Sequence, residues 1–395
     1  MFVVFIIFMT DKEEVKFYSK AKVSPNKEGE VEISAEVPTE VFNDVYEGVV
    51  EQALTNFEAP GFRKGKAPKE LFMQHANLAH LLEESASESL KLAYPQIIAD
   101  EDLDIVSNPE ISITKLAPNN PMTFVAKVAV APKVDLANYK SIAKKIYAET
   151  VPGEATDDEV RDVLKRFVSL QNKTQDGADS KDKQNEDPLK MLTDEFVKTL
   201  GPFTDVKSFL TQVRKDLTES KKSSWKKEKR ETLAKELVDN SKFNLSKLLL
   251  SEEWDRHAKV MKDQLIKANL TEEDYAKQLG IEVKDFIDRE KEGVEKQLRV
   301  KFILRAIADE ESIKPNKQEI AEELEMLIQR YPEADPVRAH AFIEESLSNE
   351  ATLKFLEKEG GLIDDKLVQN QVDKSGVDVG GDNNNNDQKD QKATS

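Results

Sequence analysis

The chain has 395 residues, more than the ~250 at which a single hydrophobic core stops growing, so we expect two or three compact units. Charged residues make up 34% of it and aromatic residues only 7%, which favours long solvated helices over a compact β-rich or α/β enzyme. The net charge of −18 repels nucleic acid except at a local basic patch, so we predict no DNA partner. The chain contains no cysteine, which excludes disulfides, thiolate nucleophiles and Cys-based metal sites, and suits a reducing cytosol.

The first nine residues are apolar but far shorter than the ~20 residues that span a bilayer. They lack the preceding basic residues and the following small-residue cleavage site of a secretory signal. We interpret residues 1–14 as an N-terminal extension, with the functional start at Met9. The alternative is a short segment that touches a membrane.

Residues 15–133 predict one α+β domain. Residues 31–37 alternate apolar and polar side chains, and residues 16–23 do so more weakly, as in a hairpin of half-buried strands. Strands are expected at 16–23, 31–37, 103–113 and 122–130. Helices are expected from Pro38, where apolar residues line one face as far as Leu54, and at 68–75 and 78–98.

From Thr156 onward strand patterns vanish and amphipathic helices follow one another. Two narrow apolar stripes predict helical arms whose inner faces meet a partner helix or a ligand. The stripes are Leu250, Trp254, Ala258, Met261 and Leu265, and then Val294, Leu298, Phe302 and Ile303. Helix starts are expected at Thr271 and at Ser348 or Asn349, whose side chains accept from free N–H groups.

Composition divides the remaining chain. Residues 134–171 predict a connecting segment and a first helix, and residues 188–362 a helical domain with arms. Between them, residues 172–187 contain one apolar residue, Ala178, and predict a polar linker. Residues 363–395 are of low complexity and predict a disordered tail.

A basic segment at residues 59–69 is unusual in this acidic chain, because it holds four basic side chains and no acidic one. Pro60, Gly61 and Gly65 impose turns that would leave the stretch from Phe62 to Lys64 at an exposed tip. The cations at such a tip can reach phosphate, and an aromatic ring between them suits a ribonucleoprotein surface. The alternative is a solvated turn with Phe62 folded back onto its own core.

The stretch from Pro60 to Pro68, which follows an amphipathic helix and a strand hairpin, resembles the ribosome-docking signature of the trigger factor family of ribosome-associated bacterial chaperones. The resemblance continues more weakly to about residue 360, and residues 298–308 resemble the second arm of the family's substrate cradle. It implies contact with the large ribosomal subunit beside the exit tunnel, through a ribosomal protein and rRNA. The implied ribosome-binding residues are Gly61, Phe62, Arg63, Lys64, Gly65 and Lys66. The implied fold is an α+β ribosome-docking domain followed by a mostly α-helical, elongated substrate-cradle domain.

Family members usually carry a prolyl-isomerase domain of the FKBP type at the place of residues 172–187. These 16 residues include no aromatic side chain and cannot supply the apolar pocket that such an enzyme needs. We therefore predict no isomerase activity and no catalytic site.

Other chemistry has little support in the sequence. The histidines at 75, 80, 257 and 340 match no metal-site spacing, and no phosphate-binding loop is visible, so we predict no metal, no cofactor and no use of ATP. Scattered apolar side chains on the helices suit passive, promiscuous holding of unfolded chains. The candidates are Leu250, Trp254, Met261, Leu265, Phe302 and Phe342, of which we expect at least half to hold the helices together instead.

The sequence thus predicts an ATP-independent chaperone, cytoplasmic and partly ribosome-bound, that holds nascent or unfolded polypeptides, and it allows weak self-association. The alternatives are an exported or membrane-associated chaperone with a similar helical body, and a prolyl isomerase. A dedicated RNA regulator is disfavoured by the net charge.

Overall fold

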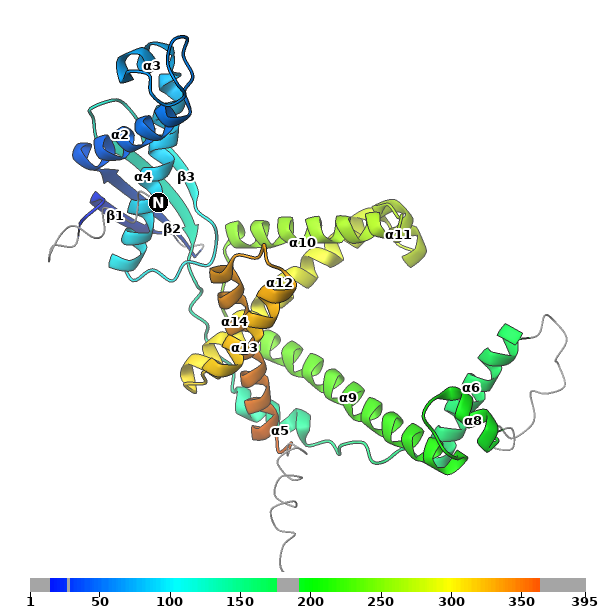
Figure 1. The fold of residues 1–395 in the computed structure, drawn as a ribbon. Helices are drawn as coiled ribbons and strands as arrows, with labels where there is room; N and C mark the ends of the chain where they lie inside the picture. Colours follow the sequence, from blue (N-terminus) through cyan, green and yellow to red (C-terminus); the bar gives the residue numbers. More distant parts are fainter. Residues whose placement is uncertain (1–14, 27–28, 176–191, 363–395) are drawn as a thin grey trace, which may run out of the picture. The chain divides into compact units, whose positions relative to one another are not determined.

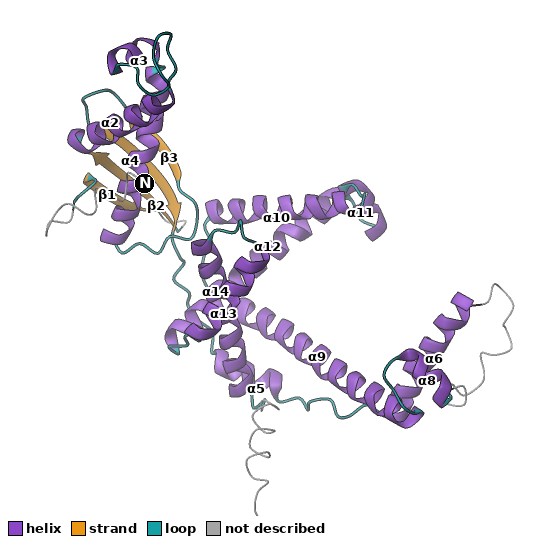
Figure 2. Ribbon diagram, in the orientation of Figure 1, coloured by secondary structure: helices purple, strands orange, loops and turns teal. Residues whose placement is uncertain are grey.

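The computed structural model describes residues 15–26, 29–175 and 192–362. Grouped by mutual contact, the chain forms two units. The first comprises the residues through Asp135 together with Ser241–Ala306, and the second comprises Leu136–Asn240 together with the residues from Ile307 on. Every strand among the described residues lies in the first unit (Figure 2). The α+β region followed by a largely helical region is therefore confirmed.

The first unit contains a four-stranded antiparallel sheet in the order β1-β2-β4-β3. Its strands are β1 (Ser19–Pro25), β2 (Glu30–Val37), β3 (Glu110–Lys115) and β4 (Met122–Ala129). Alternation in β2 places Ile33 and Val37 on the buried face, and Ile33 stands opposite Ala126 in β4. The sheet register thus follows from the apolar pattern.

Two helices cover the buried face of the sheet (Figure 1). The helices of this region are α2 (Thr39–Asn56), α3 (Lys69–His75) and α4 (Leu78–Asp100). Phe42 from α2 and Ile97 from α4 pack in one core with Phe124 from β4. Asn77 caps α4 by accepting a hydrogen bond from the His80 N–H.

The predicted strand at 103–113 begins too early, because β3 starts at Glu110. In the preceding segment, Ile105 makes an isolated bridge to Val130. Leu103 and Ile105 pack against the sheet core, which explains their apolar pattern. Pro109 has no N–H for a strand ladder, which is consistent with pairing that begins after it.

Three further helices belong to the first unit or begin in it: α10 (Lys247–Lys267), α11 (Glu272–Leu279) and α12 (Val283–Glu310). They join the sheet through a core cluster in which Ala129 of β4 packs with Leu249 of α10 and Leu298 of α12. The predicted start of α11 is confirmed, because Thr271 forms a capping box with Asp274.

A buried carboxylate fastens α10 to the sheet. Glu30 of β2 is 3% exposed, and its Oε1 accepts hydrogen bonds from Ser246 Oγ at 3.0 Å and Leu248 N at 3.3 Å. Its Oε2 accepts from Asn26 Nδ2 at 2.9 Å and pairs with Lys127 Nζ at 3.0 Å. Burial raises the pKa of the Glu30 carboxyl, but these hydrogen bonds outweigh burial and lower its pKa to about 2. Ser246 is the N-cap of α10, so the negative charge also suits this helix end.

Two further polar contacts join the sheet region to α10 and α12, and both are exposed. The backbone N–H of Asn108 donates to Glu252 Oε2 at 2.9 Å, and Arg305 Nη2 lies 2.5 Å from Asp104 Oδ2. Each contact joins the segment before β3 to α10 or α12. The sheet and these helices are therefore connected by polar as well as apolar contacts.

The regular elements of the second unit are all helices in its described residues. Its helices are α5 (Tyr139–Tyr147), α6 (Asp157–Gln175), α8 (Asp194–Leu200), α9 (Val206–Asn240), α13 (Lys317–Arg330) and α14 (Pro336–Glu359). Arg230 of α9 binds Glu350 of α14 through two parallel hydrogen bonds of 2.9 Å, and its Nε donates to Glu357 at 2.6 Å. These bonds hold α9 against α14.

The predicted helix start at Ser348 or Asn349 is wrong, because α14 runs through both residues. The helix begins where the side chain of Asp335 caps it and Pro336 occupies its first turn, both favourable start signals. The Ser348 carbonyl instead accepts from Thr352 Oγ1 within the helix.

The predicted domain boundaries stay predictions. Helix α6 continues to Gln175, so the first four residues of the predicted linker are helical. Residues 1–14, the rest of the linker at 176–187 and the tail at 363–395 lie outside the described residues. Within the described part of the chain, no helix is both long enough and apolar enough to cross a membrane.

We predict that Glu30→Gln lowers the free energy of unfolding by about 1–3 kcal/mol at neutral pH, because a buried ion pair and charged hydrogen bonds are lost. The depressed pKa of Glu30 means that its contribution is fully present above pH 4.5 and is lost as the pH falls toward 2. In urea unfolding experiments, the difference in free energy of unfolding between wild type and variant should therefore become smaller as the pH falls over that range. Glu32→Gln, an exposed position on the same strand, is the control and should change little.

Candidate functional site

The basic segment forms a tight loop between α2 and α3. The Phe62 N–H donates to the Ala59 carbonyl at 3.1 Å, and the Gly65 N–H donates to the Phe57 carbonyl at 3.0 Å. The Lys66 N–H then donates to the Arg63 carbonyl at 2.9 Å. Backbone hydrogen bonds therefore define the loop on both sides of Phe62.

The two glycines serve this loop in different ways. Both have positive φ, +85° at Gly61 and +72° at Gly65, a region that other residues rarely adopt. A Cβ at Gly65 would also lie 2.5 Å from the Thr55 carbonyl oxygen, whereas a Cβ at Gly61 would meet open space. Any side chain at residue 65 would push the loop away from the end of α2.

Phe57 anchors the base of the loop. Its ring packs edge-on against Phe72 at a centroid distance of 5.2 Å and stacks on His75 at 6.3 Å. Phe57 and Phe72 belong to a small core, separate from the sheet core, that includes Val50 and Leu81. The base of the loop is therefore held by this small core, in which the Phe57 ring packs.

Phe62 remains 45% exposed and is not folded back onto a core. Arg63, Lys64 and Lys66 are also exposed. Lys64 Nζ lies 3.7 Å from Glu58 Oε1, but both side chains are more than half exposed, so this pair is weak. An aromatic ring and three cations are thus available to a partner at this tip.

The six apolar candidates on the helices differ in exposure. Leu250, Trp254 and Phe302 belong to the cluster between the sheet, α10 and α12. Met261 and Leu265 pack with Phe286 in a second cluster. Phe342 is 68% exposed on α14 and lies in the second unit. Five of the six candidates therefore pack in cores, and Phe342 remains open to a ligand.

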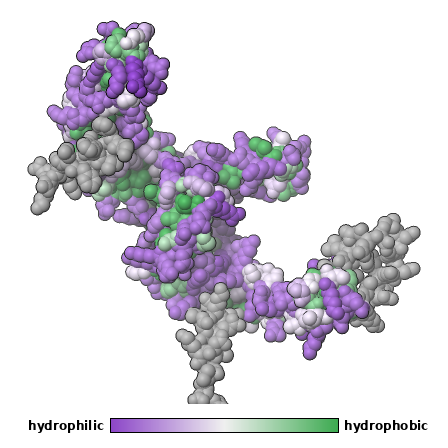
Figure 3. Space-filling view, in the orientation of Figure 1, coloured by the Kyte–Doolittle hydropathy of each residue, from purple (hydrophilic) through white to green (hydrophobic). Residues whose placement is uncertain are grey.

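The sequence analysis missed other exposed apolar side chains. Met326 of α13, Tyr331 of the following turn and Val337 of α14 are 61%, 49% and 78% exposed, and Leu279 of α11 is 51% exposed. Met326 and Val337 fall between the buried positions of their helices, so a search for large apolar residues off the stripe would have found these two. Figure 3 shows hydrophobic side chains gathered at a few places on a mostly hydrophilic face, one of them over the end of α10 near α11.

The histidines that the sequence analysis considered as metal ligands have other neighbours. His75 stacks on Phe57, and His257 Nε2 lies 2.8 Å from Glu290 Oε2. Within the described ranges no cluster of three or more His, Asp or Glu side chains could hold a metal ion.

Comparison with known proteins identifies two matching family profiles. Residues 19–167 match "Bacterial trigger factor protein (TF)" and residues 205–368 match "Bacterial trigger factor protein (TF) C-terminus". Neither match includes residues 168–204. The matched residues make up most of the chain.

Individual relatives agree with these profiles. Trigger factor of Bacillus mycoides (strain KBAB4) is 23% identical over 377 residues, covering 76% of this chain and 88% of the relative. Trigger factor of Bacillus pumilus (strain SAFR-032) is 22% identical over 376 residues, covering 76% and 89%. A solved structure described under promiscuous substrate recognition by the trigger factor chaperone aligns at 14% identity and a TM-score of 0.46, covering 87% of this chain and 100% of that one.

Proposed function

Because the chain belongs to the trigger factor family, we propose that it is an ATP-independent chaperone that docks on the large ribosomal subunit and holds emerging polypeptides. The observation that carries the docking part of this proposal is the exposure of Phe62, Arg63 and Lys64 at the tip of a loop that backbone hydrogen bonds define. In this proposal the ring inserts into an apolar recess and the cations contact rRNA phosphates. The partner would be a ribosomal protein and rRNA beside the exit tunnel, and the protein would be cytoplasmic and partly ribosome-bound.

Gly61 and Gly65 support docking through the backbone. They set the turn that brings Phe62 to the tip, and Lys66 adds a cation after the turn. Because the loop is already ordered by its hydrogen bonds, docking costs less conformational entropy than it would for a flexible loop.

The holding half of the proposal rests on exposed apolar side chains in an otherwise charged helical surface. Phe342 is the strongest of the six candidates, and Val337 on the same helix joins it. Leu250, Trp254, Met261, Leu265 and Phe302 act mainly by packing, which fits the expectation that at least half hold helices together. Weak and separate contacts allow release without ATP.

We further propose that the chain has no prolyl-isomerase activity. The argument is the polar, aromatic-free sequence at 172–187, which offers no material for an apolar prolyl pocket. Its function would then depend on docking and holding alone.

We predict that a Phe62→Ala, Arg63→Ala, Lys64→Ala triple variant no longer cosediments with purified large ribosomal subunits at moderate salt. Hydrogen bonds to charged groups contribute roughly 1.5–3 kcal/mol each, so affinity should fall at least about a hundredfold. A Lys277→Ala, Leu279→Ala, Lys284→Ala variant makes the same charge change on exposed residues elsewhere and should bind as wild type does. Equal pelleting of the two variants would show that the loop is not the anchor.

We predict that Phe342→Ser combined with Val337→Ser weakens binding of an unfolded polypeptide. Partial burial of each side chain is expected to contribute about 1 kcal/mol, so affinity should fall roughly fivefold per residue. The measurement is suppression of aggregation of a chemically denatured protein, together with thermal unfolding of the variant. His340→Ser, exposed on the same helix, is the control. Unchanged suppression with both substitutions would sink the assignment of this helix to substrate contact.

We predict that catalytic amounts of the protein do not accelerate the proline-limited refolding of a test protein. Its uncatalysed time constant is on the order of tens of seconds. The measurement is refolding fluorescence, with an FKBP-type isomerase as positive control. Acceleration at substoichiometric amounts contradicts the proposal, whereas slowing at stoichiometric amounts is the result expected from holding.

A further inference from the structure

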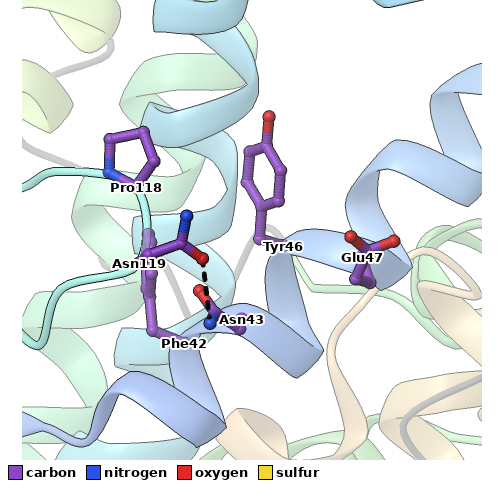
Figure 4. Close-up of a pocket in the computed structure, with 6 residues that line it drawn as sticks. All are labelled: Phe42, Asn43, Tyr46, Glu47, Pro118 and Asn119. Atoms are coloured by element: carbon purple, nitrogen blue, oxygen red, sulfur yellow. Dashed lines mark hydrogen bonds between the residues drawn. The ribbon is translucent and has the colours of Figure 1, made fainter. Parts of the chain in front are cut away.

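A small pocket lies between the first half of α2 and the turn that joins β3 to β4, both in the first unit (Figure 4). Its volume is about 220 Å³. The lining residues are Phe42, Asn43, Tyr46, Glu47, Pro118 and Asn119. Asn119 has a φ of +55°, which asparagine tolerates, and its Oδ1 accepts a hydrogen bond from Asn43 Nδ2 at 3.3 Å. This bond ties the turn to α2 and keeps the pocket wall in place.

Size and charge restrict what the pocket can hold. Its volume is below the ~300–1,000 Å³ of sites for drug-sized ligands and cofactors, but it is enough for one long side chain. No cationic side chain lines it, so an anion would find no partner there, and the single lining carboxylate of Glu47 is too few ligands for a metal site.

The lining groups together suit a guanidinium. In Figure 4 the Tyr46 ring stands between Glu47 on one side and Pro118 and Asn119 on the other. A planar cation can stack on the Tyr46 ring while it pairs with the Glu47 carboxylate and donates to the Asn43 side-chain oxygen. Pro118 supplies apolar surface for the methylene stem of an arginine.

Glu47 already has a partner outside the pocket lining. Lys69 Nζ pairs with its Oε2, and the two side chains are 42% and 55% exposed. Ion pairs this exposed contribute little net stability, so an incoming cation with more contacts can replace the lysine. Lys69 is the last residue of the basic segment and the first residue of α3, so this pair ties α2 to the start of α3.

We propose that this pocket binds an arginine side chain of an extended polypeptide through Tyr46, Glu47 and Asn43, in exchange for Lys69. Occupancy releases the tie between α2 and α3 while Phe57 and Gly65 keep the base of the loop in place. The site does not depend on ribosome docking, so it is tested without ribosomes.

The experiment titrates the full-length protein with the peptide Gly-Ser-Arg-Ser-Gly and with the same peptide carrying citrulline, a neutral isostere of arginine. The readout is the NMR shifts of the Asn43 and Asn119 side-chain amides, assigned by substitution. We expect saturable shifts with the arginine peptide and binding at least about fivefold weaker with citrulline. Glu47→Gln should reduce arginine binding to the citrulline level, and Lys69→Ala should increase it.

Glu51→Gln is the matched control, because it removes the same charge one turn farther along α2 at an exposed position outside the pocket. It should leave arginine binding unchanged. Equal affinity for the two peptides, or equal loss in the Glu47→Gln and Glu51→Gln variants, would overturn the site. Arginine binding that is no tighter in Lys69→Ala than in wild type would overturn the exchange.

Discussion

The arrangement of the first unit depends on one buried carboxylate. Glu30 belongs to a strand, yet two of its hydrogen bonds come from the first turn of α10, more than two hundred residues later. A carboxylate that is 3% exposed is tolerated only with full hydrogen bonding, and here Asn26 and Lys127 complete the set. The interaction is specific to one placement of α10, because a shift of the helix would break the hydrogen bonds from Ser246 and Leu248 to a buried carboxylate oxygen. Apolar packing around Leu249 and Leu298 then adds stability to a placement that the polar contacts select.

In the basic loop, different residues hold the backbone in place and remain exposed for binding. Phe57, inside a small core, and Gly65, in close contact with α2, fix the loop, while Phe62 carries no packing role and remains exposed. Exposure of a large apolar side chain to water is unfavourable. Burial of the Phe62 ring against a binding partner would remove this unfavourable exposure. The structure therefore separates the residues that build the loop from those that remain available to bind.

Much of this was accessible from the sequence, and the reasons for the exceptions are physical. Alternation in residues 31–37 and the glycines and prolines of the loop act locally, so they predicted β2 and the exposed tip. The association of α10 with the sheet was not predictable, because periodicity says nothing about which partner a helix face meets. Five of the six candidate holding residues came from the two apolar stripes, and a stripe marks the packed side of a helix; the sixth, Phe342, lies outside both stripes and is exposed. For that reason Met261, Leu265 and Phe302 are in cores, whereas Val337, off the stripe, is exposed.

Charge pairing distinguishes the basic stretch of α9 from the basic loop. In α9, Lys221 pairs with Glu159, Lys226 with Glu357, and Arg230 with Glu350 and Glu357. These cations face acidic side chains of α6 and α14, so their charge is used within the unit. In the basic segment, Lys69 pairs with Glu47, but Lys64 lies 3.7 Å from Glu58 in a pair whose two side chains are more than half exposed. The exposed side chains of Arg63, Lys64 and Lys66 therefore keep the charge of the loop tip available to an anionic partner.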